Sequence, residues 1–178
     1  MTIPFFLKRA IHQKAQKQAE QKLRCFSDSK KIVILTSEKL EEVQVNMKWL
    51  AQTYPHFENI QLFNFSKDKT ALSQNFQNVS MKEVNHRNFT FFGDLKKEHS
   101  NELLSKDYDL LINADSSSSL FLHLLASSLK ADFKTGISDE VCKNLYKIKV
   151  YAQQEIGFKE YIEQTSNYLE ALCGKGNT

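Results

Sequence analysis

The stretch Lys31-Ile-Val-Ile-Leu-Thr36 is the part of the chain that decides the fold. Its apolar residues are mostly β-branched, and neither glycine nor proline interrupts them. A short run of this kind between polar residues is typical of a strand buried on both faces, as in a parallel sheet. Apolar residues spaced three or four apart follow between positions 38 and 54, which predicts a helix that Pro55 ends. A strand followed by a helix is the repeating unit of an α/β fold.

Strands and helices alternate along most of the chain. The further predicted elements, in chain order, are strand 60–65, helix 94–106, strand 108–114, helix 120–130, strands 133–137 and 145–150, and helix 154–172. Residues 66–88 are polar and poorly patterned, which predicts a surface excursion with a weak strand near 79–84, and residues 88–93 predict a short strand or a turn. We therefore expect a three-layer, Rossmann-like α/β fold with a mostly parallel sheet of about five strands.

Length and composition predict the number of domains and the cellular compartment of this fold. The 178 residues suit one domain, predicted over 29–174, with a basic N-terminal helix in 1–28 and a disordered tail at 175–178. The three cysteines, Cys25, Cys142 and Cys173, have no metal-type spacing, and their odd number does not suggest a disulfide framework. A reducing cytoplasm is the expected compartment.

The N-terminal segment carries most of the positive charge. Residues 1–24 sum to about +5, whereas the whole chain is +3 at pH 7. A helix is predicted over 5–24, with a thin apolar stripe whose members are Leu7, Ile11, Ala15, Ala19 and Leu23. The cations of this segment are Lys8, Arg9, Lys14, Lys17, Lys22 and Arg24.

Three interpretations of this basic helix stay open. It could follow the phosphates of RNA or of a ribosome, or it could lie on an anionic membrane with Phe5, Phe6 and Leu7 in the lipid. It could also be a solvated helix that only covers the sheet. The apolar run from Ile3 to Leu7 is too short and in the wrong order for a secretory signal, and no run approaches the length of a membrane span.

A serine tract after the strand at 108–114 is the sharpest local feature. Its residues are Asp115, Ser116, Ser117, Ser118 and Ser119. They stand where a parallel strand gives way to a helix, which is the edge at which open α/β sheets bind ligands, so a phosphate or carboxylate could be held there. The alternative, which we favour, is that Asp115 or a serine caps the helix.

Other catalytic signals are weak. The first strand-to-helix turn, with Thr36 and Ser37, contains no glycine, so the phosphate-binding motifs of nucleotide enzymes are missing and no cofactor or metal is expected. His123 lies in an apolar helix and is predicted to be a core imidazole. The acidic neighbours of Cys142 would raise the pKa of its thiol, which disfavours a nucleophile.

Four segments together carry a resemblance to known proteins. The basic start, Asn88-Phe-Thr-Phe-Phe-Gly-Asp94, Tyr108-Asp-Leu-Leu-Ile-Asn113 and Phe133-Lys-Thr-Gly-Ile137 resemble an uncharacterised family of short Bacteroidetes-type proteins. Over Asp109 to Ile137 the chain is more distantly similar to the N-terminal half of heptosyltransferases of the GT-B type. That resemblance implies a Rossmann-like half whose Gly- and Asp-bearing first loop is replaced here by residues 36–39.

These observations favour a non-enzymatic binding or accessory protein whose basic helix contacts a polyanionic surface, RNA or the ribosome first. The alternatives are a minimal or degenerate glycosyltransferase-like or phosphate-ligand enzyme acting near Thr36 and Asp115, and a peripheral protein of the inner membrane.

Overall fold

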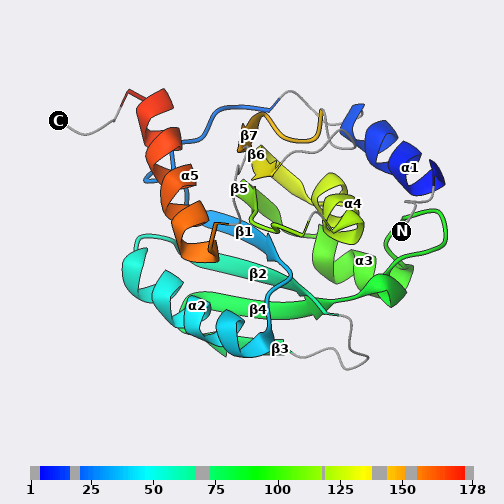
Figure 1. Ribbon diagram of the computed structural model, residues 1–178, viewed down its shortest axis with the longest axis horizontal. Helices are drawn as coiled ribbons and strands as arrows, with labels where there is room; N and C mark the ends of the chain where they lie inside the picture. Colours follow the sequence, from blue (N-terminus) through cyan, green and yellow to red (C-terminus); the bar gives the residue numbers. More distant parts are fainter. Residues whose placement is uncertain are drawn as a thin grey trace.

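The computed structural model describes residues 5–16, 21–66, 73–117, 119–137, 144–150 and 156–174. The elements in chain order are α1 (Phe5–Gln16), β1 (Lys31–Thr36), α2 (Leu40–Thr53), β2 (Asn59–Phe65), β3 (Ser73–Phe76), β4 (Val79–Val84), the 3-10 helix η1 (His86–Asn88), α3 (Lys97–Leu104), β5 (Asp107–Asn113), α4 (Leu120–Ser128), β6 (Lys130–Ile137), β7 (Ile148–Val150) and α5 (Phe158–Leu172). Figure 1 shows them as one sheet between two groups of helices. The three-layer, Rossmann-like α/β fold expected from the sequence is confirmed.

The sheet has seven strands within the described residues, not about five. Their order is β3-β4-β2-β1-β5-β6-β7, and every pairing is parallel except that of β3 with β4. The two further strands come from segment 66–88, where β4 is the weak strand predicted near 79–84 and β3 was not predicted. In β4, Val79 and Met81 are buried while Ser80 and Lys82 are half-buried, so the strand alternates with a period of two that its polar residues disguise. The polar strand β3 is at the edge of the sheet, where little hydrophobic patterning is needed.

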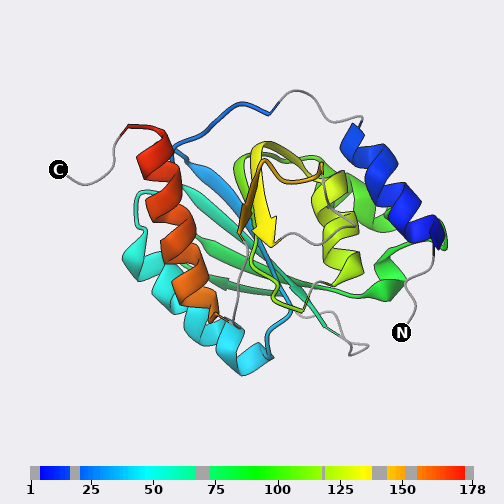
Figure 2. The ribbon, with the colours of Figure 1, turned by 45° about the horizontal axis from the view of Figure 1, so that its top comes forward.

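Each face of the sheet has its own apolar layer. In β1, Ile32 and Ile34 pack with α2 and α5, whereas Val33 and Leu35 pack with α1 and α4. All four side chains are fully buried. Burial of both faces explains why the run at 32–35 is continuous instead of alternating. Figure 2 shows α2 and α5 side by side on one face, with α1, α3 and α4 on the other.

The N-terminal helix is part of the packed body. Leu7 is 7% exposed, and Ile11 is 0% exposed, in the layer that α1 shares with α4. The helix is shorter than the predicted 5–24, because it ends at Gln16, and residues 21–24 are not helical. Ala19 lies outside the described residues, and Leu23 is exposed instead of continuing the apolar stripe.

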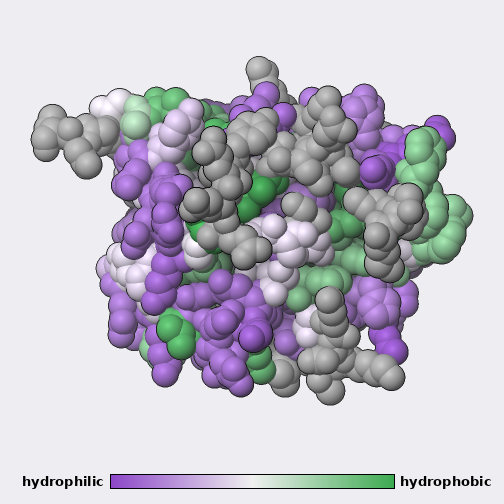
Figure 3. Space-filling view, viewed as in Figure 1, coloured by the Kyte–Doolittle hydropathy of each residue, from purple (hydrophilic) through white to green (hydrophobic). Residues whose placement is uncertain are grey.

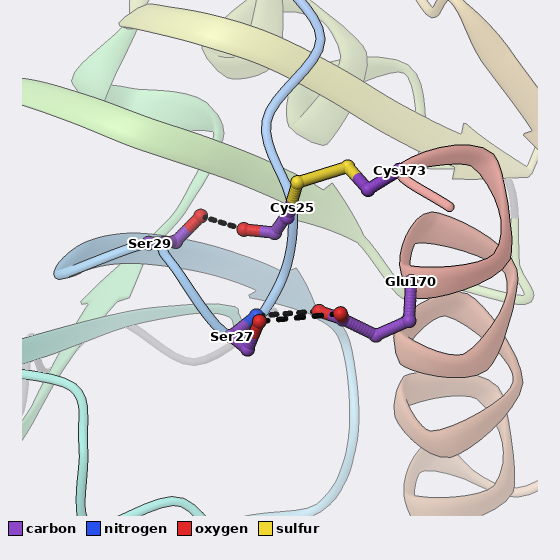
Figure 4. Close-up of a disulfide and its surroundings, with 5 residues drawn as sticks. All are labelled: Cys25, Ser27, Ser29, Glu170 and Cys173. Atoms are coloured by element: carbon purple, nitrogen blue, oxygen red, sulfur yellow. Dashed lines mark hydrogen bonds between the residues drawn. A yellow bond between two sulfur atoms is a disulfide. The ribbon is translucent and has the colours of Figure 1, made fainter. Parts of the chain in front are cut away.

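A disulfide joins the segment before β1 to the end of α5, which corrects the expectation from the cysteine count. Cys25, in the segment before β1, is bonded to Cys173 at the end of α5, with 5.8 Å between their Cα atoms (Figure 4). Beside it the backbone N–H of Ser27 donates to the carboxylate of Glu170 at 2.6 Å. An odd number of cysteines does not prevent two of them from pairing. The cysteine count therefore no longer supports the expected reducing compartment. Cys142 lies outside the described residues.

Several other predictions are modified only at their boundaries. Of the two alternatives predicted for 88–93, a short strand or a turn, the structure has the turn, which follows η1, and β7 is shorter than 145–150. The closing helix begins at Phe158, with residues 151–155 outside the described part. The tail at 175–178 also lies outside it. Among the described residues, no helix is long and apolar enough to cross a bilayer.

Candidate functional site

The position at which open α/β sheets hold ligands, here called the crevice, lies between the carboxyl ends of β1 and β5. From β1 the chain builds the sheet outward through β2 and β4, and from β5 it builds outward in the other direction through β6 and β7. The loops after two such strands diverge to opposite faces, which opens a crevice in most proteins of this architecture. Thr36 and Ser37 stand at one side of this point, and Asp115 stands at the other, as the sequence predicted.

Hydrogen bonds to Asp115 close this crevice. Its Oδ1 accepts from the Ser37 hydroxyl, from the Ser117 hydroxyl at 2.7 Å and from the Ser117 backbone N–H at 3.2 Å. Its Oδ2 accepts from the backbone N–H of Ser119 at 2.6 Å. The Ser37 and Ser117 hydroxyls are themselves 3.1 Å apart, so the loops after β1 and β5 are tied together. Asp115 is 1% exposed, and its carboxylate occupies the donors that an anionic ligand would need.

The predicted helix cap therefore has an unexpected form. Ser119 is the N-cap residue of α4 but makes no side-chain cap bond, and the carboxylate of Asp115 takes its N–H from four residues earlier. Of the other candidates, Ser116 is exposed and Ser118 lies outside the described residues. Thr36 is buried, and within the described structure its hydroxyl has no hydrogen-bond partner.

A buried polar network lies next to this turn and supports it. The Nδ1 atom of His123 is 2.9 Å from the Tyr146 hydroxyl, and the amide of Asn113 donates to the same hydroxyl at 2.7 Å. Gly136 makes room for the tyrosine, because a Cβ there would lie 2.9 Å from the ring. All three polar residues are at most 3% exposed, so His123 is the core imidazole that the sequence predicted.

Of the five N-terminal cations that the structure describes, two are paired with acidic side chains and three are exposed. Lys14 pairs with Asp94 at 3.0 Å, and Arg24 pairs with Asp132. Lys8, Arg9 and Lys22 are exposed, and Lys17 lies outside the described residues. Lys8 and Arg9 stand in the first turns of α1, so the exposed charge of that helix is concentrated at its N-terminal end.

Exposed phenylalanines gather at the same end of α1. Phe5 is 77% exposed, and Phe91 and Phe92, in the loop before α3, are each 71% exposed. Phe6 joins the two segments, because its ring stacks on that of Phe91 with 4.5 Å between the centroids. We call Phe5, Phe6, Phe91 and Phe92 the aromatic patch. Figure 3 shows a hydrophobic lobe at this edge of the molecule, beside the N-terminal end of α1. Leu7, which the sequence analysis placed with Phe5 and Phe6, is buried instead.

A tight turn holds Phe91 and Phe92 away from the core. The N–H of Thr90 donates to the carbonyl of Asp94 at 2.7 Å, and the N–H of Gly93 donates to the carbonyl of Thr90 at 3.0 Å. Gly93 has a φ of 85° and is buried, and a Cβ there would lie 2.9 Å from a methyl of Leu124. The turn is thus anchored at Gly93 while its two phenylalanines project. Sequence reasoning missed this surface: the glycine after the two aromatics is a signal for a turn, but it does not tell which side chains project.

The described residues also line at least two cavities, one of which begins at Glu38, next to Ser37 of the crevice. One of about 540 Å³ lies between α2 and the start of α5, and its rim includes Glu38, Glu42 and Glu160. Burial raises the pKa of Glu38, whose carboxylate accepts from the amide of Asn46 at 2.5 Å. The described residues contain no group of three or more side chains that could hold a metal.

The second cavity, of about 800 Å³, lies where β5 and β6 begin, which is the edge opposite to the crevice. Lys134 lines it and is 2% exposed, and burial lowers the pKa of its ammonium group to about 7. The Nζ donates to the carbonyls of Ala126 and Leu129, both at 2.7 Å, at the C-terminal end of α4. These contacts make Lys134 a cap of that helix.

Comparison with known proteins confirms the family that the sequence suggested. The model of a family of unknown function, DUF6913, matches residues 4–172, and the chain belongs to that family. No curated protein matches. The fold is similar to that of the E. coli heptosyltransferase WaaC, solved with ADP, at 15% identity and a TM-score of 0.43. The match covers 83% of this chain and 48% of that one, so the chain spans about half the length of the enzyme.

Proposed function

We propose that the protein is a non-catalytic binding protein that attaches to a polyanionic surface through the N-terminal end of α1. The observation that carries this proposal is the exposure of Lys8 and Arg9 on a helix that is otherwise docked firmly on α4. Docking through Leu7 and Ile11 fixes the outer face of the helix, so its cations are held in place before any partner binds. Preorganisation of this kind lowers the entropic cost of binding.

The closed crevice supports binding rather than catalysis. A transferase that used the β1–β5 crevice would need its donors free for a phosphate or a sugar, and here they bind Asp115. An RNA or ribosomal surface and an anionic membrane are the two kinds of polyanion that two neighbouring cations would suit. A cytoplasmic location remains part of the proposal, and the Cys25–Cys173 bond makes an oxidising compartment the alternative.

Charge reversal tests the proposal. Binding of the full chain to total RNA and to vesicles rich in phosphatidylglycerol would be measured over a series of salt concentrations. We expect binding to at least one of them at low salt, and Lys8→Glu/Arg9→Glu to weaken it and lower the salt slope by about 2, one unit for each phosphate contact.

The matched control is Lys39→Glu/Lys48→Glu, which makes the same change in net charge on exposed residues near and on α2. It should bind almost as the unchanged protein does. Equal losses in both double variants would show that only net charge matters, and no binding to either polyanion at low salt would overturn the proposal.

A further inference from the structure

We infer that the polyanionic surface is a lipid bilayer with anionic headgroups, and that the aromatic patch enters its interface. This inference rests on the proposed function and names its partner. The aromatic patch joins two segments far apart in the sequence, since Phe6 and Phe91 stack at 4.5 Å. Phe91 and Phe92 are themselves in edge contact at 5.5 Å.

The backbone of the turn keeps the aromatic patch exposed to solvent. Three of the four rings of the aromatic patch are more than 70% exposed, although a short turn could place them inward. The neighbouring Phe89 is 5% exposed, so the same loop can bury an aromatic ring. The turn from Thr90 to Asp94 and the buried Gly93 instead direct two consecutive phenylalanines outward. Contiguous exposed apolar surface next to charged residues marks a site of interaction with a protein or a membrane.

The second argument is charge complementarity. Lys8 and Arg9 follow Phe5 by three and four residues on α1, so they lie within one helical turn of it. Aromatic rings in the interface with cations at the headgroup level are the arrangement by which peripheral segments bind anionic bilayers. Each cation near such a surface strengthens binding about five-fold.

The third argument distinguishes a bilayer from RNA. A groove for single-stranded RNA needs a series of cations along the backbone path together with rings whose faces are free for stacking. Here Lys14 and Arg24 are engaged with Asp94 and Asp132. One face of Phe91 stacks on Phe6, and Phe91 and Phe92 are in T-shaped contact with each other. A compact cluster of rings with two adjacent cations suits a planar interface better than a polymer.

Vesicle flotation of the full chain provides the first test. The vesicles would be phosphatidylcholine alone or with roughly a third phosphatidylglycerol, a composition that gives a negative surface potential. We expect flotation with the anionic vesicles, weakened by salt, and a loss of about ten-fold or more in partitioning for Phe91→Ser/Phe92→Ser. The control is Val45→Ser/Tyr168→Ser, which removes two apolar side chains that are 57% and 54% exposed on α2 and α5. It should float as the unchanged protein does.

A fluorescence measurement tests insertion separately from adsorption. Trp49 is the chain's only tryptophan and lies on α2, which covers the other face of the sheet. In Phe92→Trp a second indole would sit on the projecting turn. Brominated lipids in anionic vesicles should quench the added emission of Phe92→Trp and leave the emission of Trp49 in the unchanged protein unaffected.

The outcomes separate this inference from the proposed function. Binding to total RNA without flotation would overturn the lipid inference and leave the proposed function standing, whereas failure of both would overturn both. Self-association that Phe91→Ser/Phe92→Ser abolishes, without flotation, would assign the aromatic patch to a second copy of the chain and overturn the inference. Flotation that Phe91→Ser/Phe92→Ser leaves unchanged would also overturn it.

Discussion

The side chain of Lys134 lies between β6 and α4, where almost none of it meets water. The alternation of buried and exposed positions that marks a half-buried strand is missing around it, because residues 133–136 of β6 are all buried. Its ammonium group reaches the last carbonyls of α4 and satisfies acceptors that would otherwise be orphaned. In this position the ammonium group is shielded from water, which disfavours its charged form and lowers its pKa to about 7.

This pKa predicts how stability varies with pH. Between about pH 7 and the ordinary lysine pKa of 10.5, the unfolded chain binds a proton at Lys134 that the folded protein does not. Stability therefore rises with pH through that window, and burial of the charge is most costly below pH 7. In Lys134→Met this dependence should disappear.

Urea unfolding at pH 6 to 10 would measure the effect. The difference in the free energy of unfolding, unchanged protein minus Lys134→Met, should increase with pH by up to about 1.4 kcal/mol per unit. At any single pH this difference also contains the loss of the two hydrogen bonds of Lys134. The change of the difference with pH is therefore the quantity that tests the pKa. Lys48→Met, at an exposed site, is the control and should show no such slope. Parallel curves for the unchanged protein and Lys134→Met would contradict the assignment.

Among the elements, the turn between η1 and α3 could be predicted from the sequence only in part. The segment at 88–93 was predicted as a strand or a turn, and the turn is confirmed. Local pattern could not tell which of its aromatics face solvent, because Phe89 is buried by packing near Phe121 while Phe91 meets Phe6, 85 residues earlier in the chain. Strand β3 was missed for a related reason, since its place in the sheet depends on pairing with β4 and not on apolar residues of its own. The placement of Ser37 and Asp115 at one edge was predictable, because parallel strands end at the same edge, whereas their contact depends on β1 and β5 being neighbours, and the sequence did not predict the strand order.

The turn predicts a cost for any side chain at Gly93. In Gly93→Ala the residue would keep a φ of 85°, and its Cβ would press on Leu124 at 2.9 Å and on Leu7 at 3.2 Å. Strain in this backbone region and displaced core packing should together lower the free energy of unfolding by about 2–4 kcal/mol.

Gly174 offers the matched control for that variant. It has a φ of 72°, and nothing lies within 4 Å of a Cβ placed there. Gly174→Ala should therefore show the backbone strain alone, about 1 kcal/mol. Denaturant unfolding of both variants gives the comparison, and equal losses would mean that the close packing beneath Gly93 contributes nothing.

For the whole molecule, the longest-range covalent contact joins the segment before β1 to the end of α5. The segment before β1 crosses to the end of α5, where Cys25 and Cys173 are bonded across a separation of 148 residues. Ser27 adds hydrogen bonds to Glu170 beside it. No periodicity in the sequence reports on such a contact, because it depends on where the first and last segments meet after the sheet has formed. The bond adds a covalent tie to the packing of α5 on the sheet, where Tyr161 and Ile162 lie in the same core as Ile32.

The disulfide should contribute strongly to stability because the loop that it closes is long. Chain entropy gives an upper estimate of about 5 kcal/mol for a loop of this size. We therefore expect Cys25→Ser/Cys173→Ser to lower the free energy of unfolding of the oxidised protein by about 2–5 kcal/mol. Reductant should lower the stability of the unchanged protein by a similar amount and leave the double variant unaffected, which separates this bond from any effect of Cys142. Mass spectrometry after alkylation without reductant should find Cys142 modified and the other two cysteines protected. Alkylation of all three in protein equilibrated with oxidised glutathione would show that the bond does not form, and the segment before β1 would then be joined to α5 by the hydrogen bonds of Ser27 and Glu170 without a covalent link.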